Sequence, residues 1–474
     1  MPKFLRETIP DENQITQGVI WKQLLLFFFP ILLGTFFQQL YNTVDAVIVG
    51  NFVGKEALAA VGGATGTLIN LIVGFFVGLS SGATVIISQF FGARRAKETS
   101  QAVHTAMALA IAAGAVFMVV GIAAAPWALR AMGTPADIME HAVVYLRVYF
   151  AGMIFSLVYN IGSGILRAIG DSKRPLYFLI VCSLLNLVLD LLFVLVFRWG
   201  VLGVALATTI SQVVSGILVV LSLTRSQEIY QLRLREIRFE PAILRDIVRI
   251  GLPAGLQSVM YSASNIIIQA SVNSFGTDTI AAWTAYGKID GLYWMMMGAF
   301  GVSITTFTGQ NFGAQRYDRV RKSTRVCLAL SMGATIVMSG ILLVSGEIIF
   351  RLFTQDSAVI TRGMELLKLL VPFYFTYVCI EILSGAVRGT GDSLIPMIIT
   401  CVGVCVLRVV WIFVVVPLRH TVGMVAMSYP VTWVITSVIF IIYYCQGGWL
   451  RRCIKKAGFP PEERQSRRHS GSAA

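Results

Sequence analysis

The amino-acid sequence predicts an all-α integral membrane protein with twelve transmembrane helices in two parallel lobes of six. Its 474 residues are 56% hydrophobic and only 13% charged, with a mean hydropathy of +0.76. A soluble chain of ordinary composition carries about 25% charged residues. The apolar residues form long runs, and one span of a bilayer needs about 20 of them. A secreted, cytosolic or nuclear protein is therefore excluded.

Hydropathy and loop chemistry place the helices in order along the chain. Short basic loops separate many of the apolar runs, and several runs exceed the minimum length, so those helices tilt or protrude into water. The predicted helices are 21–50, 54–91, 97–125, 136–167, 175–197, 200–224, 244–273, 277–312, 318–347, 357–388, 394–416 and 420–446.

The distribution of basic residues predicts the orientation of these helices. The net charge is +14, and Lys and Arg gather in alternate loops, 28 of them on one side of the membrane and 7 on the other. This asymmetry is the positive-inside pattern of a multi-pass membrane protein, and it argues against nucleic-acid binding. We expect a bacterial-type inner (cell) membrane protein with both termini in the cytoplasm, including an N-terminal segment (1–20) and a basic tail (447–474) that is disordered and attracted to anionic lipid at its start.

The two halves of the chain repeat one another. SQFFGARR (88–95) aligns with GQNFGAQR (309–316), and SGILRAIGDSKRP (163–175) aligns with SGAVRGTGDSLIP (384–396), both at an offset of 221 residues. The offset equals six helices, an even number, so both halves run in the same direction. The sequence predicts an N-lobe (21–224), a cytoplasmic linker (225–243) and a C-lobe (244–446), with substrate binding between lobes that rock in alternating access.

No catalytic constellation accompanies these helices. The four histidines, at positions 104, 141, 420 and 469, are widely scattered, and the cysteines have no ligand cluster around them. We therefore expect no enzyme activity and no cofactor. Two fused lobes enclose a complete pathway, which allows a monomer.

Polar residues inside the N-lobe spans form a candidate ion site. Asp45 lies deep in the first helix, and Asn186 and Asp190 share one face of the fifth because they are four residues apart. A charge at mid-membrane costs about 2.5–3.5 kcal/mol, so it needs a reason. The site can hold Na⁺ through oxygen atoms or a proton on a carboxyl group. The alternative is that each carboxylate hydrogen-bonds a neighbouring helix, but the C-lobe has Ile267, Leu407 and Trp411 at the equivalent positions.

Together these features resemble the multidrug and toxic compound extrusion (MATE) family. The resemblance rests on Pro30 followed by Asp45, the NxxxD pair of helix five, and the duplicated FGAxR and RxxGDS loops, and it runs from about residue 20 to 446. It implies the MATE (MOP-type) transporter fold. It also implies that Thr208 completes the ion site of Asp45, Asn186 and Asp190, and that Pro30 is a hinge at which helix one bends.

The C-lobe departs from one branch of the family. That branch carries carboxylates in helices seven and ten, where this chain has Tyr261 and Tyr377. Glu381, one turn from Tyr377, either substitutes for them or pairs with Lys368 or another base. The pattern is closer to the DinF-like branch, with an ion site in the N-lobe only.

Further polar and aromatic residues of the C-lobe are candidates for a substrate cavity. Lys288, Asp290 and Arg408 are charges within predicted spans, so they face a cavity or pair internally. Trp283 and Tyr286 can hold organic cations by cation–π attraction, although most such residues simply pack helices or face lipid. The candidate cavity residues are Tyr261, Trp283, Tyr286, Lys288, Tyr377, Glu381 and Arg408.

These observations predict a secondary active antiporter in the lipid bilayer. It would export amphipathic small molecules, with organic cations as the expected class, in exchange for H⁺ or Na⁺, and Na⁺ would bind at Asp45, Asn186, Asp190 and Thr208. Two alternatives stay open. One is a flippase for a lipid-linked precursor, which would favour a basic central cavity and two extra helices that this chain lacks. The other is an exporter of one specific metabolite.

Overall fold

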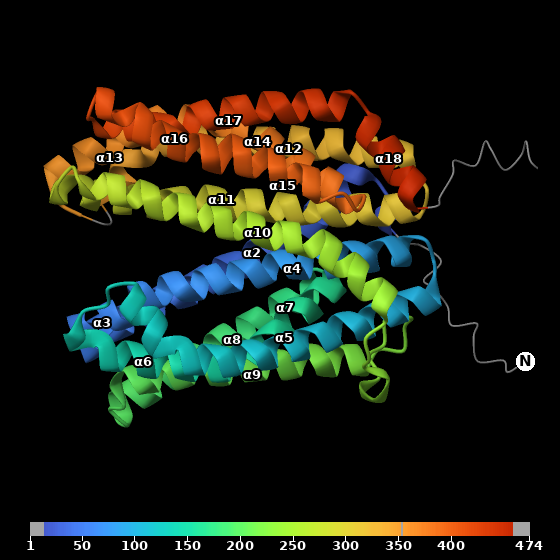
Figure 1. The fold of residues 1–474 in the computed structure, drawn as a ribbon, viewed down its shortest axis with the longest axis horizontal. Helices are drawn as coiled ribbons and strands as arrows, with labels where there is room; N and C mark the ends of the chain where they lie inside the picture. Colours follow the sequence, from blue (N-terminus) through green and yellow to red (C-terminus); the bar gives the residue numbers. More distant parts are fainter. Residues whose placement is uncertain (1–13, 352–353, 458–474) are drawn as a thin grey trace, which may run out of the picture. The chain divides into compact units, whose positions relative to one another are not determined.

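The computed structural model describes residues 14–351 and 354–457, and these residues form helices joined by short turns, with no β-strand among them. They divide into two compact units. Unit 1 contains residues 25–259, and unit 2 contains residues 14–24 and the described residues from 260 onwards. In Figure 1 the long helices of each unit run roughly side by side. The all-α membrane fold is thus confirmed, while the predicted lobe boundaries stay predictions.

Unit 1 is built from long apolar helices and shorter segments that break them. Its helices are α2 (Ile20–Ile48, from Leu25 on), α3 (Lys55–Gly62), α4 (Ala64–Gly92), α5 (Ala96–Ala131), α6 (Ala136–Ala151), α7 (Met153–Ala168), α8 (Lys173–Leu191), α9 (Gly200–Thr224) and α10 (Pro241–Asn273, to Val259). Both α2 and α8 end in a π-helical turn, η2 (Val49–Val53) and η3 (Leu192–Val196). Such wide turns occur often at functional sites.

Unit 2 repeats this design with the second half of the chain. Its helices are α1 (Gln14–Gln17), the start of α2 (to Leu24), the last part of α10 (from Met260), α11 (Thr277–Gly313), α12 (Tyr317–Arg351), α13 (Ser357–Leu370), α14 (Tyr374–Gly389), α15 (Leu394–Thr400), α16 (Leu407–Val414), α17 (Val422–Cys445) and α18 (Gly448–Ala457). A π-helical segment, η6 (Cys401–Val406), joins α15 to α16. Helices α5 and α12 begin at Ala96 and Tyr317, which reproduces the 221-residue offset found in the sequence.

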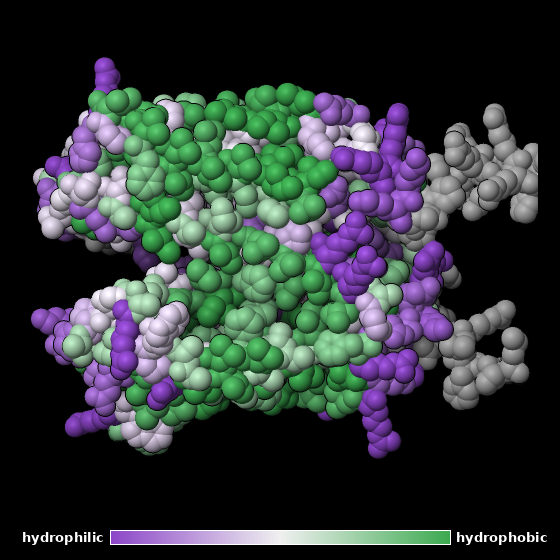
Figure 2. Space-filling model, in the orientation of Figure 1, coloured by the Kyte–Doolittle hydropathy of each residue, from purple (hydrophilic) through white to green (hydrophobic). Residues whose placement is uncertain are grey.

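The twelve predicted helices all coincide with helical segments, but not all of them are equally apolar. Nine helical segments of the described chain are long and apolar enough to cross a membrane, or ten if the bent pair α6 and α7 is one span. Helices α10 and α11 are long enough but more polar, and they are not among the ten. Figure 2 shows apolar side chains covering the middle of each unit and hydrophilic ones at its ends, as expected for helices that cross a bilayer.

Glycine residues bring α4 against α10 within unit 1. The sequence places Gly74, Gly78 and Gly82 on one face of α4, and a Cβ atom added to Gly78 would lie 2.5 Å from the backbone nitrogen of Gly255. A Cβ on Gly82 would lie 2.3 Å from the carbonyl oxygen of Ile247. Only glycine permits so close an approach of two helices. The close packing explains why the first part of α10 belongs to unit 1.

The linker packs against unit 1, and the start of the tail is more ordered than the sequence predicts. In the linker, Ile229, Tyr230 and Leu232 are buried in the core of unit 1. The start of the tail was expected to be disordered, but residues 448–457 form α18, and Trp449 and Leu450 pack in a cluster with Phe312, Val320 and Val387. That expectation is wrong for these residues because the helix is amphipathic and one face finds an apolar partner. The rest of the predicted tail, 458–474, and most of the N-terminal segment, 1–13, lie outside the described residues.

Candidate functional site

The predicted ion-site residues come together inside unit 1. Asp45 extends from α2, Asn186 and Asp190 from α8, and Thr208 from α9. All four side chains are buried, and Asp190 is 0% exposed. The carboxyl groups of Asp45 and Asp190 lie near enough for their charges to interact, although no hydrogen bond joins them.

Most polar atoms of this cluster have no hydrogen-bond partner. They are Asp45 Oδ1, both carboxyl oxygens of Asp190, both side-chain polar atoms of Asn186 and the hydroxyl of Thr208. A buried polar atom left without a partner costs about 1–3 kcal/mol, and more if it is charged. Nor does any ion pair within the described residues include Asp45 or Asp190. The cluster therefore brings carboxyl, amide and hydroxyl groups together without a basic side chain or a hydrogen bond to satisfy them within the described residues.

A tyrosine that sequence reasoning missed completes this cluster. Tyr145, on α6, interacts with Asp45, with Asp190 and with Thr208, and its side chain is 7% exposed. Tyr149 lies one turn further along α6 and is also buried. The repeated tyrosine at a spacing of four residues on one helical face was a usable signal, because buried phenols need polar partners.

Apolar side chains close one end of the site. A core cluster joins the ends of α2 and α8 to α3, α6 and α9, and it consists of Ile48, Val49, Ala57, Tyr145, Val194, Val201, Val204 and Ala205. Ile48 follows Asp45 by three residues and Val194 follows Asp190 by four, so each lies about one helical turn from a carboxylate. The two carboxyl groups thus lie next to a buried apolar cluster.

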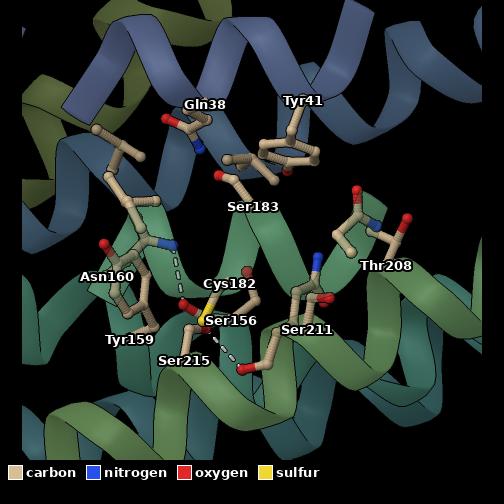
Figure 3. A pocket seen from close by; sticks show the side chains of 15 residues that line it. Gln38, Tyr41, Ser156, Tyr159, Asn160, Cys182, Ser183, Thr208, Ser211 and Ser215 are labelled. Carbon is tan, nitrogen blue, oxygen red and sulfur yellow. Dashed lines mark hydrogen bonds between the residues drawn. The ribbon is translucent and has the colours of Figure 1, made fainter. Parts of the chain in front are cut away.

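A polar cavity of about 210 Å³ lies beside the cluster and includes Asn186 and Thr208 in its wall. Figure 3 shows Gln38 and Tyr41 of α2 extending toward the polar side chains of α7, α8 and α9. Its lining residues are Gln38, Tyr41, Val73, Val77, Ser156, Tyr159, Asn160, Leu179, Cys182, Ser183, Asn186, Thr208, Ser211, Gln212 and Ser215. None of them is charged.

Several polar atoms of this wall are also unpartnered. The hydroxyl groups of Ser183 and Ser211 and the side-chain oxygen of Gln212 have no hydrogen-bond partner. By contrast, Asn160 donates to the carbonyl oxygen of Ser156 at 2.8 Å. A polar cavity of this size with free donors and acceptors suits water or a small polar group. The cavity reaches the carboxyl cluster through Asn186 and Thr208, which belong to both.

In unit 2 the structure joins three of the predicted cavity residues in a chain. The hydroxyl oxygens of Tyr261 and Tyr377 are 3.3 Å apart, and Tyr377 donates to Glu381 Oε2 at 3.3 Å. The hydrogen-bond partner of Glu381 is thus a tyrosine, not Lys368, which is exposed. Lys288 is also exposed and does not join this group.

A second polar network in unit 2 surrounds Asp290. Its carboxylate accepts hydrogen bonds from Tyr374 Oη at 2.5 Å, Trp294 Nε1 at 2.6 Å and Tyr286 Oη at 3.3 Å. Of the two expectations for Asp290, a cavity-facing charge or an internal pair, these bonds fit the second, but the partners are neutral. Tyr374 and Trp294 were not predicted as members. Tyr286, Asp290 and Trp294 repeat every four residues along α11, which is the pattern that could have indicated this network.

Arg408 is held by an aromatic ring. Its guanidinium carbon lies 3.9 Å from the centre of the Tyr429 ring, and Nη2 donates to the hydroxyl of Thr432 at 3.3 Å. The same Tyr429 ring lies 6.0 Å from the ring of Trp283, which also neighbours Tyr286 at 6.2 Å. The predicted residues Trp283, Tyr286 and Arg408 therefore belong to one aromatic cluster.

A membrane-embedded helical fold with a polar cavity beside buried carboxyl groups is typical of a membrane transporter. Comparisons with known proteins agree. The family model described as MatE matches residues 30–192 and again residues 253–414, one match in each half of the chain. The chain belongs to the MatE family of multidrug efflux transporters. The two matches reproduce the internal repeat seen in the sequence.

Individual relatives support the same assignment. The chain is 29% identical over 394 residues to the probable multidrug resistance protein YpnP of Bacillus subtilis, covering 83% of this chain and 88% of that one. It is 25% identical to the probable multidrug resistance protein NorM of Thermotoga maritima, covering 92% and 94%.

Solved structures show the same fold. One is an outward-facing multidrug resistance MATE transporter of the MOP superfamily, with a TM-score of 0.87, 24% identity and coverage of 94% of this chain and all of that one. Another, a MOP superfamily transporter from Pyrococcus furiosus, has a TM-score of 0.86 at 23% identity and covers 92% and 98%. The predicted MATE (MOP-type) fold is thereby confirmed.

Proposed function

We propose that the chain is an antiporter that exports amphipathic organic cations in exchange for H⁺ or Na⁺. The observation that carries the proposal is the buried pair Asp45 and Asp190, whose carboxyl groups interact with each other while no basic residue of the described chain pairs with them. Two adjacent buried carboxylates repel each other unless a proton or a metal cation lies between them. A transported cation is the simplest means of neutralising them.

The donor set is compatible with either ion. Asp45, Asn186, Asp190 and Thr208 present hard oxygen atoms, which suit an alkali cation. A proton needs only one of the two carboxyl groups. Neutralising the pair would remove the electrostatic repulsion between α2 and α8, and α2 would then bend at Pro30, which lies within the helix. The bend would reshape the neighbouring polar cavity and release the exported compound.

The membrane energetics are sufficient for this exchange. One elementary charge that crosses 100 mV provides about 2.3 kcal/mol, which corresponds to roughly a fifty-fold concentration ratio. The relatives named as multidrug resistance proteins favour organic compounds as exported substrates. The asymmetry of Lys and Arg between alternate loops favours a cell-membrane location with both ends of the chain in the cytoplasm.

The structure favours this proposal over export of a lipid-linked precursor. Such a substrate carries phosphate groups and calls for a basic cavity, but the lining of the polar cavity in unit 1 contains no Lys or Arg. In unit 2 Arg408 is 2% exposed and covered by Tyr429, so it does not present an open cationic surface.

Ethidium efflux from proteoliposomes tests the proposal. We would impose a pH gradient or a Na⁺ gradient on the purified full chain and compare it with Asp45→Asn and with Asp137→Asn, a matched change at an exposed aspartate of α6. We expect one gradient to drive efflux in the wild type and Asp137→Asn but not in Asp45→Asn. Equal efflux by all three proteins would remove Asp45 from the mechanism, and no efflux from folded wild-type protein would overturn the proposed function.

A further inference from the structure

The segment that leads into α2 belongs to the other unit. Residues 14–24 cluster with unit 2, although α2 from Leu25 onward belongs to unit 1. The short helix α1 lies against α11, and the side chains of Ile15 and Thr16 are 6% and 5% exposed. The chain therefore passes from one unit to the other within a continuous helix.

Two arginines at the start of α12 hold this segment by its backbone. Arg319 donates from Nε and Nη2 to the carbonyl oxygen of Ile15 at 3.2 and 3.0 Å, and from Nη2 to that of Gly18 at 2.5 Å. Arg316 donates from Nη1 to the carbonyl oxygen of Thr16 at 2.7 Å. Charge-assisted hydrogen bonds are roughly twice as strong as neutral ones, and a planar guanidinium can reach several acceptors at once. The segment is thus anchored by several bonds.

The equivalent helix of unit 1 holds the segment that leads into α10. On α5, His104 Nε2 accepts a hydrogen bond from the backbone nitrogen of Arg233 at 3.0 Å. The hydroxyl oxygen of Thr105 accepts a hydrogen bond from the backbone nitrogen of Glu240 at 3.2 Å. Helices α5 and α12 are related by the internal repeat. In each half of the chain the segment before the first long helix is therefore anchored on the third helix of the other half.

Helix α2 carries both the proposed hinge and the proposed ion ligand. The anchored segment ends at Leu24, Pro30 follows six residues later, and Asp45 lies beyond it in unit 1. When a helix bends, a chosen end moves relative to the rest of the protein only if the opposite end is held in place. Without an anchor, a bend at Pro30 would move the free N-terminal end and leave Asp45 where it was.

We propose that Arg319, assisted by Arg316, is a positioning residue for ion-coupled transport, because it fixes the N-terminal end of α2 to unit 2. The inference rests on the proposed function, since it gives the ion-dependent bend a fixed point. His104 and Thr105 hold the corresponding segment at the start of α10, which also contains a proline, Pro253.

The test compares four full-length proteins: wild type, Arg319→Ala, Arg319→Lys and Lys322→Ala. Lys322 is an exposed base on the same helix, one turn further along, so its removal is a matched loss of charge. Three quantities are measured for each: backbone amide hydrogen exchange over residues 14–24, the affinity for ethidium in detergent, and the rate of gradient-driven efflux. The melting temperature serves as the control for folding.

We expect Arg319→Ala to speed amide exchange in residues 14–24 and to slow driven efflux by about tenfold, within the range of roughly 2- to 30-fold found for residues that couple distant sites. Ethidium affinity should stay within about twofold, since Arg319 is not among the residues that line the cavity. Arg319→Lys should have an amide exchange rate and an efflux rate between those of the wild type and Arg319→Ala, because a single ammonium group replaces the planar guanidinium. Lys322→Ala should behave as wild type.

Other outcomes would overturn the inference. If Arg319→Ala loosens residues 14–24 but drives efflux at the wild-type rate, the anchor has no role in coupling. If exchange does not change, the arginine does not hold the segment. If Arg319→Ala does not fold, Arg319→Lys takes its place. Faster amide exchange in residues 14–24 of that variant, together with efflux at the wild-type rate, would likewise mean that the anchor has no role in coupling. Absence of driven efflux in the wild type would instead count against the proposed function, and the exchange measurement would still decide whether the anchor exists.

Discussion

The carboxyl groups of Asp45 and Asp190, from helices α2 and α8, interact with each other in the buried interior of unit 1. Neither oxygen of Asp190 has a hydrogen-bond partner. Two carboxylates held together in a membrane-embedded bundle are unfavourable without a cation, and this local instability is what a coupling ion would relieve.

Replacing one of these carboxylates should therefore stabilise the empty protein while abolishing its activity. We expect Asp190→Asn to raise the melting temperature by a few degrees in Na⁺-free detergent at an alkaline pH at which both carboxyl groups of the wild type are ionised, because one of two adjacent charges is removed. The variant should also eliminate driven efflux. If Na⁺ is the coupling ion, added Na⁺ should raise the melting temperature of the wild type but not of the variant. A lower melting temperature for Asp190→Asn would contradict this electrostatic interpretation.

The hydroxyl of Tyr145 should tune the ion site. It lies within electrostatic range of both aspartates and next to Thr208, so Tyr145→Phe removes a nearby polar group, an effect of about 1 kcal/mol. We expect roughly a fivefold weaker apparent affinity for the coupling ion, measured from efflux at increasing ion concentration. Tyr149→Phe, one turn along the same helix, is the matched control and should have a smaller effect. Equal effects of the two changes would mean that Tyr145 has no special role.

The contact between α4 and α10 should tolerate a methyl group at one glycine and not at the next. A Cβ at Gly78 would lie 2.5 Å from the backbone of α10, whereas the nearest atom to a Cβ at Gly74 is the Cβ of Ser258 at 3.6 Å. We expect Gly78→Ala to lose about 1–3 kcal/mol of stability through overpacking. Gly74→Ala should be neutral or stabilising, because alanine favours a helix. The melting temperatures of the two variants test this prediction. Equal values for Gly78→Ala and Gly74→Ala would show that α4 and α10 separate easily.

The network around Asp290 should be structural. Asp290→Ala would remove the acceptor shared by Tyr374, Trp294 and Tyr286, at about 1–3 kcal/mol for each donor left without a partner. The hydroxyls of Tyr286 and Tyr374 would still bond each other, at 2.9 Å in the present structure. We expect a clear loss of thermal stability, with efflux per folded molecule retained. Asp290→Asn, which keeps an acceptor oxygen, should lose less. A variant with wild-type stability and no transport would instead make Asp290 part of the transport pathway.

The packing of α18 can be tested through its cysteine. Burial raises the pKa of the Cys453 thiol, and the side chain is 5% exposed. At pH 7.5 less thiolate is present than for a free cysteine, so maleimide labelling should be slow and should accelerate as the pH rises. The experiment uses a variant in which the other six cysteines are replaced by alanine. Adding the substitution Trp449→Ala should speed labelling at constant pH. Fast labelling of the variant that keeps Trp449 would show that α18 does not pack on unit 2.

Much of this architecture can be predicted from the sequence because it depends on local patterns. Hydropathy alone predicts the helices, and the duplicated FGAxR and RxxGDS loops predict two similar halves. The spacing of Asn186 and Asp190 places both on one face of a helix whatever surrounds it. The resemblance to a known family adds Thr208 and connects these residues with Asp45.

Tertiary structure alone decides which residues from distant parts of the chain meet. Nothing in the local sequence indicates that Tyr145 approaches the aspartates, that Gly78 faces Gly255, or that Arg319 holds the segment before α2. Each of these contacts depends on how helices pack, and hydropathy assigns a helix to the membrane without assigning it a neighbour. The tail shows the same limit, because α18 is polar on one side and becomes ordered only where its apolar side meets the core of unit 2.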